Sequence, residues 1–282
     1  GDQPYIMLSY VDPSRLTGFE QRREKALENF LDMDGQTGKE KEYFLNMNAK
    51  VDTPLQYRWT EGWTFITADF VSQCGVALAI FLAIGIAPMF CGEWQDHTKA
   101  LIATTKNGWK KIAGIKVMAA FLFTLELFGI VTVSSVFLQI VFLGTEGWDM
   151  PIQCIKILAA APWNVLQAEI YEYIYLLLAA LGYTGIILLC SALTKSNYVS
   201  LLISLSIIFV PMAVSQFLPL WGQKLLDLIP FVGSSTDIFR TNIYHLLGQR
   251  IWSPYLLITV PIILGLTALP FTVHLWAKRA KV

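Results

Sequence analysis

Residues 93–116 read EWQDHTKALIATTKNGWKKIAGIK, and this lysine-rich stretch lies between two apolar runs that are each long enough to cross a bilayer. Its acidic residues Glu93 and Asp96 precede its lysines, which is the order that suits a helix macrodipole. Asn107 and Gly108 supply a stop, since both residue types tolerate the left-handed conformation. The pattern predicts a short helix over about residues 93–106 that lies against a membrane. Such a helix is either a simple interfacial element or a dock for a cytoplasmic partner.

The composition is that of a membrane protein. Of the 282 residues, 55% are hydrophobic and 15% are charged, whereas a soluble domain carries about a quarter charged residues. Of the 42 charged residues, 19 precede residue 68. The formal net charge is +0, so no nucleic-acid partner is indicated. The four cysteines have no paired spacing and the three histidines are scattered, which predicts thiols that behave as small hydrophobes and no metal site.

Residues 1–67 form a polar head that we expect to be a small helical domain. A rough apolar stripe predicts one helix over about residues 15–34, capped by Asp12-Pro13-Ser14, and a second helix over residues 39–48. Two short helices predict a hairpin that is too small to bury much core by itself.

Five apolar runs follow the head, and each reaches the roughly 20 residues that cover a hydrocarbon core of about 30 Å. The expected fold class is therefore all-α, a polytopic membrane domain over residues 68–282. Only residues 195–197 join the third and fourth runs, so these two are expected to form a tight antiparallel pair. The expected spans cover about residues 68–90, 117–143, 170–194, 198–218 and 255–276.

Two loops on the side opposite to residues 93–116 are not plain linkers. Residues 144–167 hold a short apolar patch between two prolines, and residues 219–254 hold two amphipathic pieces, 221–229 and 234–248. Both loops predict re-entrant or surface-lying helices, or simple interfacial anchors.

Lysine and arginine in the loops predict the orientation of the spans. If residues 93–116 are cytoplasmic, the inner loops hold nine basic residues and the outer loops hold four. The head is then extracellular and the C-terminus cytoplasmic. Because five spans with an outer start require a translocated head, we expect a further span or a signal peptide before Gly1.

The connecting stretch resembles that of bacterial ABC-2-type transporter permeases, the membrane subunits of ABC exporters. The family's loose pattern is a Glu after span two, then Gly-Thr, Leu, Thr, Gly-Arg and a Lys that opens span three. His97 stands where Gly is usual, and Trp109 stands where Arg is usual. The matching positions here are Glu93, Thr98, Leu101, Thr105, Gly108 and Lys116.

The resemblance implies a type V exporter-like transmembrane domain that lacks its first span. It also implies a coupling helix that contacts a separate ATPase, a permease dimer of identical or different subunits, and runs 68–90 and 198–218 lining the pathway. ATP and Mg would be bound by the ATPase, so this chain needs no cofactor. The coupling residues would be Glu93, Trp94, Asp96, His97, Thr98, Lys99, Leu101, Thr105 and Lys106. Cargo would be amphiphilic, peptide or drug-like, and the chain's other partner is membrane lipid.

Glu126 is the only acidic residue deep within an expected span. A carboxylate at the bilayer centre costs about 2.5–3.5 kcal/mol on insertion scales. Glu126 therefore either faces the translocation route or accepts a hydrogen bond from a Thr or Tyr of a neighbouring helix. Asp69 is expected at the headgroups, and Glu169 with Glu172 at a solvated helix start.

Several catalytic motifs are absent. The sequence holds no GxxxxGK[ST] phosphate loop, no HExxH and no GxSxG. We therefore expect a transporter subunit and not an enzyme. Two rival hypotheses remain, namely a sensor or immunity subunit that binds an extracellular peptide without transporting it, and, less favoured, a membrane-embedded enzyme.

Overall fold

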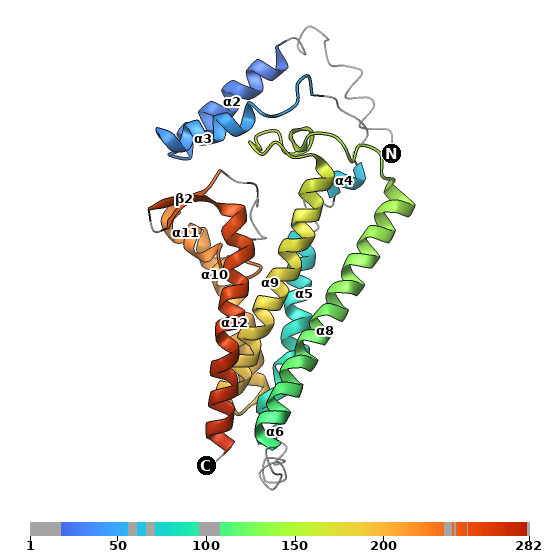
Figure 1. The fold of residues 1–282 in the computed structure, drawn as a ribbon, viewed down its shortest axis with the longest axis vertical. Coiled ribbons are helices and arrows are strands. Elements are labelled where there is room, and N and C mark those ends of the chain that lie inside the picture. Colours follow the sequence, from blue (N-terminus) through green and yellow to red (C-terminus); the bar gives the residue numbers. More distant parts are fainter. Residues whose placement is uncertain are drawn as a thin grey trace. The chain divides into compact units, whose positions relative to one another are not determined.

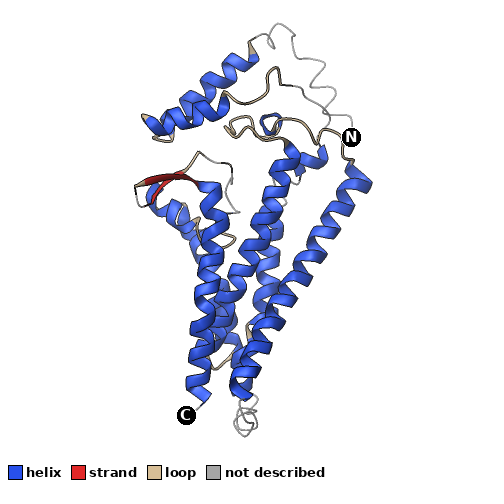
Figure 2. Ribbon diagram, in the orientation of Figure 1, coloured by secondary structure: helices blue, strands red, loops and turns tan. Residues whose placement is uncertain are grey.

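The computed structural model describes residues 18–55, 61–65, 71–95, 108–233, 239, 241–246 and 248–280. These residues are mostly helical, with one two-stranded sheet among them (Figure 2). The chain divides into two compact units. Unit 1 comprises Gly1–Thr60 and Glu146–Gln167, and unit 2 comprises Glu61–Thr145 and Ala168–Val282.

Unit 1 contains the predicted helical hairpin. Helix α2 (Phe19–Met33) and helix α3 (Lys39–Asn48) confirm the two predicted helices, although the predicted cap at residues 12–14 lies outside the described residues. Leu27, Leu31 and Phe44 are fully buried between them. The hairpin does not build its core alone, because Met150 and Ile152 of the second segment of unit 1 are also buried.

Residues 144–164 do not form the predicted re-entrant or surface-lying helix. The only helical turn in this stretch is the 3-10 turn η4 (Ile152–Cys154), and Pro151 forms an isolated β-bridge with Asn164. The backbone N–H of Ile152 donates to the carbonyl of Trp163 at 2.9 Å. Pro151 and Pro162 lack an N–H and fix their backbone angle, which explains why this apolar patch folds as a compact loop.

Unit 2 contains five helices that are long and apolar enough to span a membrane among the described residues, which confirms a multi-pass membrane protein. They run from Gln73 to Gln95, Lys111 to Leu143, Val165 to Leu193, Asn197 to Ser215 and Ser253 to Lys278. In Figure 1 they carry the labels α5 (Val71–Ile86) with α6 (Pro88–Gln95), α8 (Gly108–Leu138) continued by the π-helix η3 (Gln139–Leu143), α9 (Val165–Leu193), α10 (Asn197–Ser215) and α12 (Ser253–Ala280).

Helix α9 is the central helix of unit 2, between α8 and α12 in Figure 1. A Cβ added at Gly182 would lie 2.2 Å from the carbonyl oxygen of Pro261, so only glycine permits this close crossing with α12. On the other side the hydroxyls of Thr184 and Thr124, the latter on α8, lie 2.6 Å apart. Tyr183 also donates to the carbonyl of Ser204 on α10 at 2.8 Å. Helix α9 therefore organises the bundle.

The loop between α10 and α12 corrects a second prediction. Its first amphipathic piece is helical, as α11 (Leu220–Leu226), but the second ends in an antiparallel hairpin of β1 (Ile243–Leu246) and β2 (Gln249–Trp252). Leu246 pairs with Gln249, and Gly248 has a φ of 80°. A two-residue turn with positive φ favours a hairpin and stops a helix, so the fold is all-α except for this small sheet.

Candidate functional site

The residues predicted to couple the chain to an ATPase begin at the end of a span. Glu93 and Trp94 lie in the last turn of α6, so they extend the first span and do not start a separate helix. The remaining predicted coupling residues lie outside the described residues: Asp96, His97, Thr98, Lys99, Leu101, Thr105 and Lys106.

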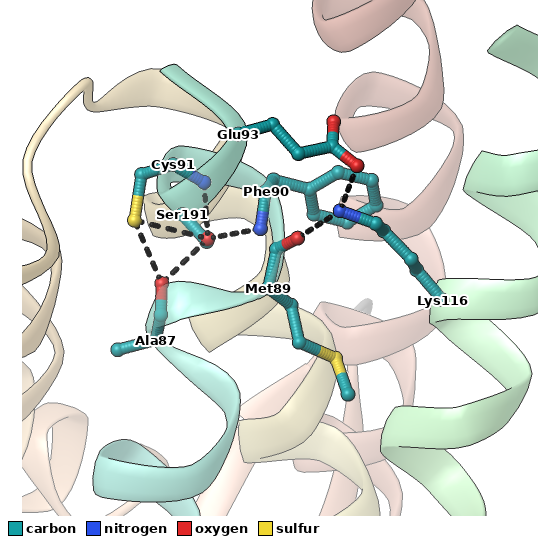
Figure 3. Close-up of polar contacts among 7 residues, drawn as sticks. All are labelled: Ala87, Met89, Phe90, Cys91, Glu93, Lys116 and Ser191. Atoms are coloured by element: carbon teal, nitrogen blue, oxygen red, sulfur yellow. Dashed lines mark hydrogen bonds and ion pairs between the residues drawn. The ribbon is translucent and has the colours of Figure 1, made fainter. Parts of the chain in front are cut away.

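Glu93 and Lys116 form an ion pair that joins the two sides of this connector (Figure 3). The Lys116 Nζ lies 2.5 Å from the Glu93 Oε1, and the two side chains are 20% and 14% exposed. Lys116 Nζ also donates to the carbonyl oxygen of Met89. Removing one partner of this partly buried pair would leave the other charge without compensation. The ends of α6 and α8 are therefore held together.

Aromatic rings of two helices surround the Lys116 ammonium. Its Nζ lies 5.4 Å from the ring centroid of Phe90 on α6 and 5.6 Å from that of Trp276 on α12. The two rings also pack against each other at 5.2 Å, and both are almost fully buried. Cation–π attraction is stronger where water is excluded. Lys116 thus links α6, α8 and α12 at one point.

The first span is broken just before this ion pair. Helix α5 ends at Ile86 and α6 begins at Pro88, which has no N–H to continue the helical hydrogen bonds. Figure 3 shows Ser191 of α9 at the break. The Ser191 Oγ accepts from the backbone N–H groups of Phe90 and Cys91 at 2.9 and 3.2 Å and donates to the Ala87 carbonyl at 2.6 Å.

Ser191 thereby acts as a helix N-cap supplied by another helix. The first N–H groups of any helix need partners from outside it, which are usually the hydroxyl or carboxylate of the preceding residue. Ser200 of α10 adds a second donor to the Ala87 carbonyl at 3.1 Å. The break is therefore a satisfied hinge. We call Ala87, Pro88, Ser191 and Ser200 the hinge, and Glu93 with Lys116 the connector clamp.

The short turn between α9 and α10 packs against α6. The Lys195 Nζ lies 5.1 Å from the ring centroid of Trp94. The backbone N–H of Asn197 donates to Gln95 Oε1 at 3.4 Å, and Asn197 Oδ1 lies 3.1 Å from Cys91 Sγ. Because the turn joins α9 to α10, these contacts connect α6 to the ends of both helices.

Sequence reasoning missed the hinge. It treated residues 68–90 as one continuous run, although Pro88 is the visible signal of a break. It had no signal for Ser191 or Ser200, because serines in apolar runs usually bond to their own helix.

Glu126 lies on an exposed face of α8 within the single chain. No hydrogen bond joins it to a Thr or Tyr of another helix among the described residues. Its neighbours Leu122, Leu125 and Ile130 are also exposed. Glu126 is therefore not held by this chain's own helices in the way that the packing hypothesis requires.

The expectation of a solvated start for α9 is wrong. Glu169 and Glu172 are 4% and 1% exposed. The side chains of Gln139 and Tyr173 lie beside the Glu169 carboxyl, and the Tyr173 hydroxyl lies 2.8 Å from that of Ser135 on α8. The end of α8 covers this face of α9, which removes water. Asp69 lies outside the described residues.

The described residues hold no group of three or more His, Cys, Asp or Glu side chains that could bind a metal ion. All four cysteines are outside disulfides, with Cys91 and Cys190 buried.

No protein-family model, curated protein or solved structure matches this chain. The function proposed below therefore rests on the geometry of the hinge and connector clamp and on the sequence pattern around them.

Proposed function

We propose that this chain is the membrane permease subunit of an ATP-driven ABC exporter of the ABC-2 type. It works as a dimer of identical or different permeases with two separate ATPase subunits, which bind ATP and Mg. Its cargo is an amphiphilic, peptide or drug-like compound.

The connector clamp is the observation that carries this proposal. Residues 96–107 join α6 to α8, and Glu93 and Lys116 hold the two sides of this connector together at 2.5 Å. A loop that served only as a link would need no such pair. A connector that transmits force does need it, because a push on the connector then displaces both helices as one body.

The hinge would allow α6 to move relative to α5. The Ala87 N–H still bonds to the Ala83 carbonyl, but Pro88 has no N–H and the next helical bonds are replaced by bonds to Ser191, so α6 can tilt against α5. Ser191 satisfies the Phe90 and Cys91 N–H groups across the break. Closure of the ATPases would thus move the α6 and α8 ends, and the hinge would pass the motion to α9 and α10.

The charges of the loops support a cytoplasmic connector. Basic residues are enriched on the cytoplasmic side of membrane proteins, and residues 93–116 hold five lysines. An ATPase is available only on that side. The head is then extracellular, the chain is multi-pass in the cell membrane, and its C-terminus is cytoplasmic.

Charge reversal at the connector clamp tests the proposal. The chain is purified from its native cells together with any ATP-hydrolysing partner, and ATP hydrolysis is measured in lipid vesicles. We expect Glu93→Lys or Lys116→Glu to lower hydrolysis at least about tenfold, equivalent to about 1.4 kcal/mol of coupling. The double exchange should recover part of it.

The matched control is Glu146→Lys, a charge reversal in the loop that follows α8, which should leave hydrolysis unchanged. Absence of any ATPase that co-purifies, or hydrolysis that is indifferent to both single reversals, would contradict the proposal.

A further inference from the structure

Unit 1 contains a cavity that transport does not account for. Its volume is about 860 Å³, within the range of about 300–1,000 Å³ that is typical of small-molecule sites. Three segments of the chain build it: the start of α2, residues 54–55 and residues 153–157. Among the described residues its apolar wall includes Phe19, Leu55, Ile155 and Ile157.

Gln153 forms a fixed part of this wall. Its side chain is 2% exposed, and its Nε2 donates to the carbonyls of Ala159 and Ala161 at 3.0 and 2.7 Å. These two bonds fix the orientation of the amide. The Oε1 has no hydrogen-bond partner among the described residues. This oxygen has almost no accessible surface, so Gln153 forms part of the wall and does not itself contact a ligand.

A second, smaller cavity shares one lining residue, Gln153, with the first. Its volume is about 220 Å³, and the described residues that line it are mostly polar, among them Lys50, Asp52 and Asn164. The buried Gln153 side chain thus separates an apolar cavity from a polar one.

The charges near the larger cavity favour a cation. Glu20 lines it, and its Oε1 accepts from the backbone N–H of Leu55 at 3.2 Å. Arg23 is buried nearby, but its guanidinium already donates to Asn48 Oδ1 at 2.5 Å and to the Ile157 carbonyl at 3.4 Å. Burial lowers the pKa of Arg23, and Glu24 and Glu20 oppose that shift. Among the described residues that line the larger cavity, Glu20 is the only charged one.

We propose that unit 1 binds an amphiphile whose apolar chain fills the larger cavity and whose amine pairs with the Glu20 carboxylate. The third polar side chain of the wall, Gln21, is exposed and can supply either a donor or an acceptor. This inference rests on unit 1 alone and does not depend on ATP-driven transport. The same site would serve a sensor that binds its ligand without moving it.

Protection of Cys154 tests the proposal, since this half-buried thiol lines the cavity. The full chain in lipid nanodiscs is labelled with a small thiol reagent, and mass spectrometry locates the label. The probes are octylamine, octanol and octanoate, which share one apolar chain length. At a concentration of about twice its Kd, octylamine should slow labelling of Cys154 about threefold. Octanol should protect less, and octanoate least.

Glu20→Gln sharpens the test, because it keeps an oxygen for the Leu55 N–H and removes the charge. We expect it to abolish the preference for octylamine over octanol. The control Glu42→Gln, on an exposed position of α3, should retain that preference. Equal protection by all three probes, or no protection by any, would overturn the proposal. Should Glu20→Gln fail to fold, the three probes on the unsubstituted chain still decide.

Discussion

Helices α8 and α9 are similar in length and apolar character, yet their surroundings differ completely. They contain 31 and 29 residues, but 11% of the most apolar window of the α8 span is buried in the chain against 67% for α9. The difference lies in what the small residues contact, because nothing lies within 4 Å of a Cβ added at Gly114 or Gly129 of α8. Helix α9 places Gly182 and Gly185 against α12, whereas α8 exposes large side chains such as Met118, Val133 and Phe137. Apolar character therefore identifies a span, whereas the close packing of its glycines distinguishes the one at the centre.

The acidic residues follow the same division. Glu169 and Glu172 of α9 are buried among protein groups, while Glu126 of α8 is exposed on an apolar face. A carboxylate that faces lipid is costly. Within the proposed dimer, the α8 face that carries Glu126 is therefore expected to meet protein or water.

Leucine at Gly182 gives the largest expected effect. Because a Cβ there would meet backbone atoms of Pro261 at 2.2 and 2.5 Å, Gly182→Leu should cost about 3 kcal/mol or more. The measurement is unfolding of the purified chain by sodium dodecyl sulfate. Gly129→Leu on α8 is the control, since nothing lies within 4 Å of its added Cβ, and it should change stability by less than about 0.5 kcal/mol. Equal losses of stability in Gly182→Leu and Gly129→Leu would contradict the tighter packing of α9.

Loss of the Ser191 hydroxyl comes next. Ser191→Ala leaves the Phe90 and Cys91 N–H groups without the oxygen of α9, so we expect a loss of about 1–3 kcal/mol. Ser206→Ala on α10 is the matched control, because that exposed hydroxyl bonds to the Leu202 carbonyl of its own helix. This control should change the free energy of unfolding by less than about 0.5 kcal/mol. If Ser191→Ala left the stability unchanged, Ser191 would not act as the N-cap of α6.

Neutralising Glu169 on α9 or Glu126 on α8 should give a smaller difference in stability between the two helices. Glu169→Gln should destabilise the isolated chain in detergent by about 1 kcal/mol, because it disturbs the acceptor beside Tyr173 and Gln139. Glu126→Gln should alter the same thermal unfolding by less than about 0.5 kcal/mol. In the assembled transporter, loss of transport by Glu126→Gln with normal assembly would place Glu126 on the route; normal transport would leave it an assembly role.

Removal of the Trp94 ring is the mildest change. The Lys195 ammonium lies 5.1 Å from its centroid, and such contacts are worth about 0.5–1 kcal/mol at partly exposed sites. Trp94→Ala should reduce the thermal stability by that amount. Trp221→Ala removes an exposed ring on α11 and should leave the thermal stability unchanged. An equal loss of stability in the two variants would mean that the ring area matters and the Lys195 contact does not.

The spans were predictable from the sequence because about 20 apolar residues can do little else than cross a bilayer. The partners of the spans were not. Ser191 lies 101 residues from Phe90 in the chain, and no local pattern links them. Glu93 and Lys116 were both recognised in the connecting stretch, but their pairing depends on how α6 and α8 meet. The hairpin at Gly248 was missed because the helical periodicity of residues 234–248 was given more weight than the turn.

The sidedness of the connector tests the central claim most directly. A cysteine is placed at Lys99 in the connector or at Lys25 in the head, and intact cells are treated with a membrane-impermeant thiol reagent. Mass spectrometry then locates the label. The proposal predicts that Lys25→Cys is labelled in intact cells and that Lys99→Cys is labelled only after permeabilisation. Labelling of both positions in intact cells would contradict it, since no ATPase could then reach the connector.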